Sequence, residues 1–347
     1  MKKITTISLS AIAAAALLAL AACGGGGGGG DSGSASSGST NTGSTGNNQN
    51  PSNPGTPSTA VPGTVDSTQY PAGSAQLAAL NLLNQYRSQC GFPALKQNTV
   101  LDQASQAHAQ YMGLNNLVSD SEVSGNQGFT GATYADRATH FGFPANAIGA
   151  GVSGGFAVTT NGFSQSIAGT GFVNSLLAGV YHLSATMYPT DLAGFGEYET
   201  QSVVQGTAVT TAWQSLSLRD TSTSQLSSAP LTFPCQGVTG VPYASRGETP
   251  TPPNVTGMWG TPIAVIANTT DTVTLSTALL TSGSSQVTLQ VLNASSDPNK
   301  LIPQNAAVAY PTAPLTPNTS YSATLTGTVN GQPFSRNFAF TTGNTVG

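Results

Sequence analysis

Residues 82–91 read LLNQYRSQCG, and this stretch decides the fold of the first half of the chain. Apolar side chains recur at helical intervals before and within it, from Leu77 to Tyr86, which predicts a helix. Gly91 and Pro93 should end that helix, because glycine and proline are typical of helix C-termini.

Further patterns follow this helix along the chain. Two more helices are predicted to begin at Thr99 and Thr133, and a fourth is predicted over residues 172–181. Strand-like stretches are then found at 192–200, 203–216 and 231–235. Helices followed by a group of antiparallel strands predict a layered α+β domain.

Residues 82–91, together with the helical pattern that starts at Thr99, resemble the opening of bacterial CAP domains. These domains form the cysteine-rich secretory, antigen 5 and pathogenesis-related superfamily, also called SCP-like. Residues 128–143 resemble the middle of the bacterial branch, and residues 181–196 resemble its second histidine segment. The resemblance implies that residues 71–240 form a CAP α-β-α sandwich, so we expect the fold class α+β.

The hallmark of this family is a cleft with two histidines and two acidic residues, which bind a divalent metal in some members. His182 matches the second histidine, whereas Asp120 stands where the first is expected and Ala150 where a glutamate is expected. Glu122 is the one carboxylate near them in a matching place. The cleft candidates are thus His182, Asp120 and Glu122. They are a poor set for a zinc site, so we expect no metal, no cofactor and no catalytic residue.

Other groups that could carry chemistry have simpler interpretations. His108 shares a helical face with apolar residues, which favours a hydrogen-bonded packing histidine over a catalytic one. Residues 151–155 form a glycine-rich stretch, expected to be a loop, with no lysine to bind a phosphate. Glu197 and Glu199 alternate along a predicted strand and share one face, which we expect to face water.

The C-terminal part has the pattern of an all-β domain. Residues 241–253 are predicted to be a linker, and residues 254–347 alternate apolar and polar side chains. Asn330-Gly331 predicts a hairpin turn, and Trp259 offers a core anchor. Residues 315–321 resemble the corner before a late strand of Ig-like sandwiches. We expect an Ig-like β-sandwich; the alternative is a β-rich extension packed on the first domain.

The N-terminus has the features of an exported lipoprotein. Residues 1–23 combine two lysines, an apolar stretch and a final Leu-Ala-Ala-Cys that resembles a lipobox, so Cys23 is the predicted lipidation site. Gly24 stands where lipoproteins kept at the inner membrane have aspartate, which favours the outer membrane. Residues 24–70 are almost all small and polar, which predicts a disordered tether.

The cysteine count predicts a disulfide, and the charge limits the classes of possible partner. Besides Cys23 the chain has only Cys90 and Cys235, and an even pair in an exported protein predicts one disulfide; two free buried thiols are the alternative. Only 6% of the residues are charged and the net charge is −4. No basic cluster occurs, so we expect no nucleic-acid partner.

These patterns together favour a cell-envelope lipoprotein whose CAP domain is a non-catalytic binding or adhesion module. Its predicted partners are the membrane, through the lipid, and an apolar, glycan or protein ligand. The near absence of ionisable residues in the CAP segment carries this expectation, because acid/base catalysis needs a titratable pair. The alternatives are a hydrolase of cell-wall or protein substrates that uses His182, and a mainly structural surface protein.

Overall fold

The computed structural model describes residues 61–222 and 224–347, which belong to one compact unit. The predicted signal peptide, the lipidation site Cys23 and residues 24–60 of the predicted tether lie outside the described residues. Residues 61–70 of that tether are part of the fold and not disordered, because the Val65 nitrogen donates to the Gln97 carbonyl oxygen at 3.2 Å and the Tyr70 hydroxyl donates to Asp102. Among the described helices, none has the length and apolar character needed to cross a membrane.

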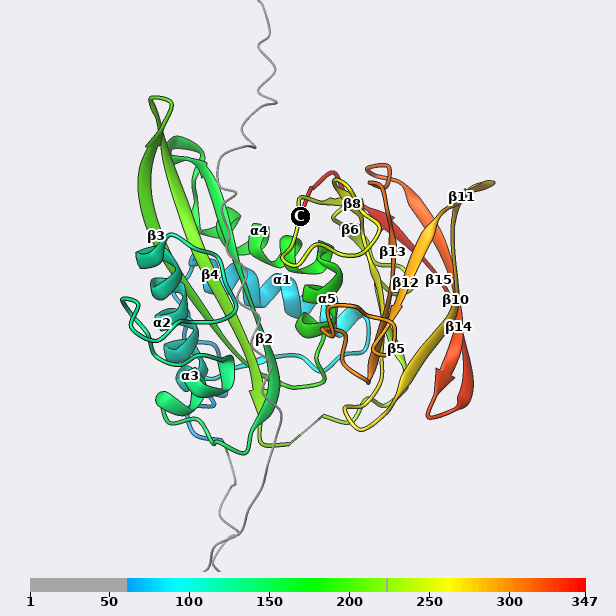
Figure 1. Ribbon diagram of the computed structural model, residues 1–347, viewed down its shortest axis with the longest axis horizontal. Helices are drawn as coiled ribbons and strands as arrows, with labels where there is room; N and C mark the ends of the chain where they lie inside the picture. Colours follow the sequence, from blue (N-terminus) through cyan, green and yellow to red (C-terminus); the bar gives the residue numbers. More distant parts are fainter. Residues whose placement is uncertain (1–60, 223) are drawn as a thin grey trace, which may run out of the picture. The chain divides into compact units, whose positions relative to one another are not determined.

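Residues 61–220 form a helical region around a four-stranded sheet (Figure 1). Its helices are α1 (Ala75–Gln89), α2 (Thr99–Asn115), α3 (Tyr134–His140), η1 (Thr160–Gly162), α4 (Gln165–Ala178) and α5 (Val180–Thr186). Its strands are β1 (Lys96–Gln97), β2 (Ile148–Thr159), β3 (Leu192–Val204) and β4 (Thr207–Asp220), in the order β1-β3-β4-β2. The expected class of mixed helices and strands is confirmed.

The sheet separates two layers of helices. Helix α2 packs closely against β3 on one side, where a Cβ at Gly196 would lie 2.2 Å from the backbone nitrogen of Gln106. Helices α1, α4 and α5 lie on the other side of the sheet (Figure 1). Glycine in β3 therefore permits a contact between helix and strand that any side chain would prevent.

Three local predictions differ from the structure. Residues 151–155 are part of β2 and not a loop; a Cβ at Gly151 would lie 2.2 Å from the ring of Tyr134, so close packing explains the glycine. The strand predicted at 203–216 is two strands, joined by a tight turn at Gln205 and Gly206, both with positive φ. The fourth helix is broken at Gly179, whose extended backbone separates α4 from α5.

The β region, residues 224–347, contains two sheets and a short strand pair. Its strands are β5 (Leu231–Phe233), β6 (Thr239–Val241), β7 (Ala244–Ser245), β8 (Trp259–Gly260), β9 (Ile263–Ile266), β10 (Val273–Ser282), β11 (Ser285–Val287), β12 (Leu289–Asn293), β13 (Ala306–Pro311), β14 (Ser320–Val329) and β15 (Gln332–Thr342). One sheet has the order β11-β10-β14-β15-β6 and the other β12-β13-β9-β5. The predicted turn at Asn330-Gly331 joins β14 to β15, and both residues have positive φ as a type I′ turn requires.

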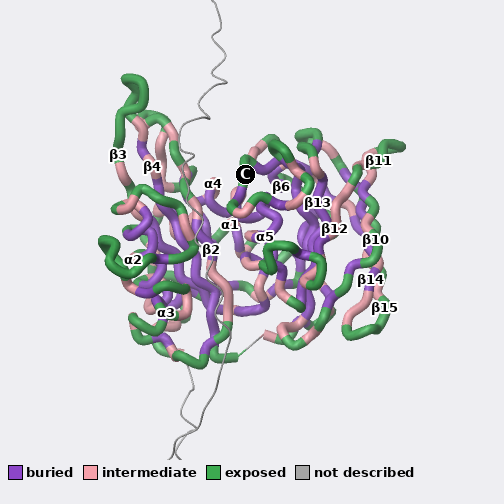
Figure 2. The backbone as a smooth tube through the Cα atoms, in the orientation of Figure 1, coloured by how far each residue is buried: buried purple, intermediate pink, exposed green. Residues whose placement is uncertain are grey.

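The helical region and the β region share one continuous core. Buried side chains of α1 and α4 belong to the same apolar cluster as those of β13 and β15, and the buried stretches of the chain are seen in Figure 2. Trp259, 1% exposed, donates from Nε1 to the carbonyl oxygen of Ala178 at 2.9 Å. Strands β5 and β6 precede residue 242 yet pair with β9 and β15. The division into domains at 240 and 254 stays a prediction.

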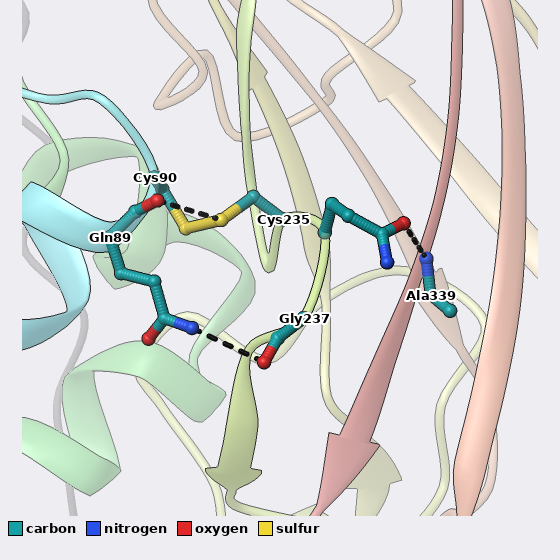
Figure 3. Close-up of a disulfide and its surroundings, with 6 residues drawn as sticks. Gln89, Cys90, Cys235, Gly237 and Ala339 are labelled. Carbon is teal, nitrogen blue, oxygen red and sulfur yellow. Dashed lines mark hydrogen bonds between the residues drawn. A yellow bond between two sulfur atoms is a disulfide. The ribbon is translucent and has the colours of Figure 1, made fainter.

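The predicted disulfide between Cys90 and Cys235 is confirmed, with a Cα–Cα distance of 5.5 Å (Figure 3). It joins the residue that ends α1 to the segment after β5, and the side chain of Gln89 donates to the carbonyl oxygen of Gly237 beside it. The covalent link therefore connects the helical region to the β region.

Candidate functional site

Glu122 and His108 form the centre of a buried polar cluster between α2 and α3. His108 Nδ1 lies 2.9 Å from Glu122 Oε1, and Nε2 lies 2.7 Å from the carbonyl oxygen of Ser119. Both ring nitrogens face acceptors, so the ring can satisfy both only by donating from both. His108 is fully buried and thus has no free nitrogen for a metal or a substrate, in agreement with the packing role expected of it.

The Glu122 carboxylate is held by several donors. Its Oε2 accepts from the backbone nitrogens of Thr130 at 2.6 Å and Gly131 at 3.2 Å, and Arg137 Nε lies 3.8 Å from Oε1. Burial alone would raise the pKa of Glu122. The hydrogen bonds from His108 and Thr130 and the charge of Arg137 outweigh burial, and they lower the pKa below its ordinary value. Glu122 is therefore a structural anion that orders the loop between α2 and α3.

Asp120 lies at the surface next to this cluster. Its Oδ1 accepts from the Tyr134 hydroxyl at 2.8 Å, and that hydroxyl also bonds Ser153 of β2. Arg137 connects Asp120 to Glu122, because its guanidinium donates to the Asp120 carbonyl oxygen at 2.9 Å and also forms the ion pair with Glu122. The same guanidinium lies over the Tyr134 ring, 4.3 Å from its centroid. Burial raises the pKa of Tyr134, so the hydroxyl acts as a donor to Asp120.

His182 lies elsewhere, on α5. Its Nδ1 is 3.5 Å from Glu248 Oε2, and the ring is 19% exposed. The Glu248 carboxylate also accepts from the backbone nitrogens of Val180 at 2.6 Å, Tyr181 at 3.1 Å and His182 at 3.2 Å. Glu248 thereby caps the first turn of α5, where Gly179 has no side chain to do so.

The structure brings two of the three cleft candidates together and leaves the third apart. Asp120 and Glu122 belong to one network, and within residues 61–222 and 224–347 no hydrogen bond or ion pair joins His182 to either of them. Ala150 lies on β2 opposite Leu218 and supplies no ligand atom. The described part of the chain holds no group of three or more metal-ligating side chains, and Glu122 is already saturated with donors. These residues do not fit the divalent metal that some CAP domains bind.

Sequence reasoning missed Glu248, Arg137 and Ser153 as members of these two networks. Glu248 lies in a stretch rich in proline and threonine, 66 residues after His182, and no local pattern links the two. Arg137 of α3 and Ser153 of β2 join the network through contacts with residues distant in the sequence, which sequence periodicity does not encode.

Glu197 and Glu199 do not share the exposure expected of them. Glu199 is exposed, whereas Glu197 is only 9% exposed and its Oε1 has no hydrogen-bond partner. Gln214, directly across the β3–β4 ladder, also has an unpartnered Oε1. Burial, and to a lesser extent the charge of Glu199, raise the pKa of Glu197 to about 7. The prediction that both face water was therefore wrong for Glu197, because helices cover this part of the sheet.

Comparison with known proteins identifies the helical region. Residues 80–215 match the CAP, or cysteine-rich secretory protein, family, so the chain contains a CAP domain. Two solved structures are similar to it. An extracellular protein containing a SCP domain from Bacillus anthracis str. Ames is 16% identical over 42% of this chain and 40% of its own, with a TM-score of 0.29. An outer surface protein from Borrelia burgdorferi is 14% identical over 42% of this chain and 93% of its own, with a TM-score of 0.27. A search of curated proteins found no match.

Proposed function

We propose that this CAP-domain chain is a cell-envelope lipoprotein whose CAP domain is a non-catalytic binding module. In this proposal a lipid on Cys23 and the part of the predicted tether at residues 24–60 hold the folded part at the outer membrane, on its periplasmic or its outer face. The support is the sequence of residues 1–70, with a lipobox followed by a polar, glycine-rich stretch.

The observation that carries the binding role concerns the tetrad, the two histidines and two acidic residues of the family cleft. In this chain, the residues assigned to tetrad positions either bond to other protein groups or have no functional group. Glu122 is buried, hydrogen-bonded to His108 and to the backbone nitrogens of Thr130 and Gly131, and ion-paired with Arg137. Asp120 accepts from the Tyr134 hydroxyl, and Ala150 has no functional group. General acid/base catalysis needs a titratable group that can exchange a proton with a substrate. Glu122, with a lowered pKa and no free oxygen, cannot do so.

A second candidate, a hydrolase of cell-wall or protein substrates, has one observation in its favour. His182 is partly exposed and its Nδ1 is near a buried carboxylate, Glu248, which is how histidine is oriented in nucleophilic catalysis. Such a mechanism also needs a nucleophile next to the other ring nitrogen. In the described part of the chain no hydroxyl or thiol hydrogen-bonds the His182 ring. This keeps the hydrolase behind the binding module, and a structural surface protein is a third candidate.

We further propose that residues 254–347 are an Ig-like domain that presents the CAP domain or binds a partner. The support is a corner before β14, where the Tyr321 hydroxyl accepts from the backbone nitrogen of Thr316 at 2.8 Å. A tyrosine bonded back to the upstream backbone is a feature of Ig-like sandwiches. The β region also has two sheets in which every strand pair is antiparallel except β15 with β6, which supports this assignment.

Calorimetric titration with Zn²⁺ at neutral pH tests the non-catalytic role. The binding-module proposal expects no one-to-one site of sub-micromolar affinity in the wild-type protein. His140→Ala is the matched control for His182→Ala, because His140 is an exposed histidine at the end of α3. A tight site that His182→Ala abolishes and His140→Ala retains would overturn the proposal and restore the enzyme candidate.

A further inference from the structure

A cavity of about 530 Å³ opens beside α2, away from the tetrad positions. Its lining comes from α2, from Gln76 near the start of α1, from Phe195 of β3 and from Tyr70 of the segment that precedes α1. None of His182, Asp120 and Glu122 lines it. A volume of this size is typical of pockets for small molecules.

The cavity borders the edge of β3 that faces away from β4, where most of the strand has no partner strand. Strand β1 pairs with β3 only at Leu192 and Ala193, so the edge is open from there on. Two side chains of α2 replace the missing strand. The Gln106 amide accepts from the Glu197 nitrogen at 3.1 Å and donates to its carbonyl oxygen at 2.6 Å, while Asp102 accepts from the Phe195 nitrogen at 3.0 Å. This wall is held by hydrogen bonds and is thus formed in advance of any ligand.

Uncommitted amides surround the cavity. Gln76, Gln103 and Gln110 all line it, and within the described residues their side chains make no hydrogen bond. Gln103 and Gln110 are two turns apart on α2, which separates them by about 10 Å along the helix axis. Each amide offers two N–H donors and a carbonyl acceptor, which can pair with the acceptor lone pairs and the single donor of a hydroxyl group.

Aromatic surface complements these amides. Tyr70 and Phe141 are half-buried and line the cavity, and Tyr70 packs edge to face on the buried ring of Phe195, with centroids 6.4 Å apart. Flat apolar rings favour a ligand that has an apolar face of its own.

The described residues that line the cavity offer no free charged group to an ionic ligand. Asp102 is the one carboxylic acid among them, and its oxygens already accept from Tyr70, Gln97 and the Phe195 nitrogen. None of these lining residues is a lysine or an arginine, so they form no charge-assisted bond to a phosphate, sulfate or carboxylate.

We propose that this cavity binds a neutral saccharide, a ligand with many hydroxyls for the amides and ring faces for the aromatic side chains. The inference rests on the proposed binding role and gives it a ligand class and a place outside the family cleft. A fatty acyl chain is the competing ligand, but it would cover the three free amides without supplying them hydrogen bonds, which costs free energy.

The test uses the full mature protein and three neutral probes of different linkage: maltotriose, cellotriose and triacetylchitotriose. Binding is followed by calorimetry and by the side-chain amide signals of ¹⁵N-labelled protein. The variant Gln103→Ala/Gln110→Ala removes two exposed amides that bond to nothing in the described fold, and alanine favours the helix. Gln286→Ala, an exposed glutamine on β11, is the control.

The expected result is saturable binding of at least one probe, weakened by about tenfold or more in the double variant and unchanged in the control, as the loss of two ligand hydrogen bonds implies. No binding of any probe, or displacement of these amide signals by decanoate alone, would overturn the inference. Saccharide binding that is unaffected by the double variant would also overturn it, yet would leave the binding-module proposal intact. A tight zinc site at His182 would instead contradict the proposal of a non-catalytic binding module and would leave the saccharide measurement unaffected.

Discussion

His182 of helix α5 and Glu248 of the following region are joined through their side chains, with Nδ1 and Oε2 3.5 Å apart. The same carboxylate accepts from three backbone nitrogens in the first turn of α5. The histidine that matches the family motif is thus part of a helix cap that links the helical region to the β region. The Tyr181 hydroxyl reinforces this link by donating to Asp297 at 3.1 Å.

Glu248→Ala should destabilise the protein, because it leaves several buried N–H groups of α5 without an acceptor. We expect a loss of about 2–4 kcal/mol in the free energy of unfolding, and a smaller loss for Glu248→Gln, which keeps one acceptor oxygen. Urea unfolding at neutral pH measures both. Asp66→Ala, which removes an exposed carboxylate, should change stability by less than about 0.5 kcal/mol. A Glu248→Ala loss no larger than this control would refute the capping role.

The features that sequence could predict are those set by local chemistry. The helix that ends before Gly91 and the turn at Asn330-Gly331 follow from periodicity and from backbone preferences of single residues. The disulfide follows from compartment and cysteine count. The assignment of Asp120 and Ala150 to the positions of the family's first histidine and glutamate stays a prediction.

What sequence could not predict depends on contacts between distant segments. The glycine-rich residues 151–155 suggest a loop by composition, but Tyr134 packs on their backbone and makes them a strand. The alternation of Glu197 and Glu199 along the strand predicts that both face water. Glu197 is nevertheless buried, because helices from distant parts of the chain cover it, and the local sequence does not indicate this. Glu248 lies where composition predicts a linker, and only the docked β region shows that it meets α5.

Cys23→Ser should release the protein from membranes. The lipobox resemblance predicts that Cys23 is the lipidated residue, and serine cannot accept the lipid in its place. Membrane and soluble fractions of cells that express wild type and variant are compared by immunoblot. Ala22→Gly, which keeps a small residue before the cysteine, is the control and should remain membrane-bound. Full retention of Cys23→Ser in the membrane fraction would refute the lipoprotein proposal.

Removal of the disulfide should lower stability through the unfolded chain. Cys90 and Cys235 are 145 residues apart, and closing such a loop is worth about 4–5 kcal/mol in the chain-entropy view, often less in practice. Urea unfolding compares Cys23→Ser protein with the same protein that also carries Cys90→Ala/Cys235→Ala. Reduction of the former should reproduce the latter. Two thiols that react with a labelling reagent in the unreduced, denatured protein would contradict the bond.

Cleavage between the predicted domains should not separate them. Strands β5 and β6 lie before the predicted linker but pair with β9 and β15, and Trp259 bonds the end of α4. We expect the fragments produced by limited proteolysis within residues 247–253 to co-elute in gel filtration even after the disulfide is reduced. A free, folded fragment of residues 254–347 would instead show that the Ig-like domain is independent of these contacts.

Glu197 should make stability depend on pH in the direction opposite to Glu122. Its pKa is about 7 in the folded protein and near the ordinary 4.5 when unfolded, so the folded state holds more protons between these values. Stability is therefore highest below pH 4.5, as far as this group is concerned, and falls as the pH rises to about 7. The full shift corresponds to about 3 kcal/mol at 1.36 kcal/mol per pH unit, and partial contact with solvent should reduce it to about 1–2 kcal/mol.

Glu197→Gln tests this dependence, because the amide is neutral at every pH and can donate to the unpartnered Oε1 of Gln214. Relative to wild type, the variant should gain stability at pH 8 and show little change at pH 4.5 in urea unfolding. Glu199→Gln removes the neighbouring exposed carboxylate and should leave most of the slope in place. Helix α4 has no charged residue and α1 only Arg87, so no other carboxylate on these helices confuses the comparison. Equal gains for Glu197→Gln at pH 4.5 and pH 8 would show that packing, and not the ionisation of Glu197, accounts for the effect.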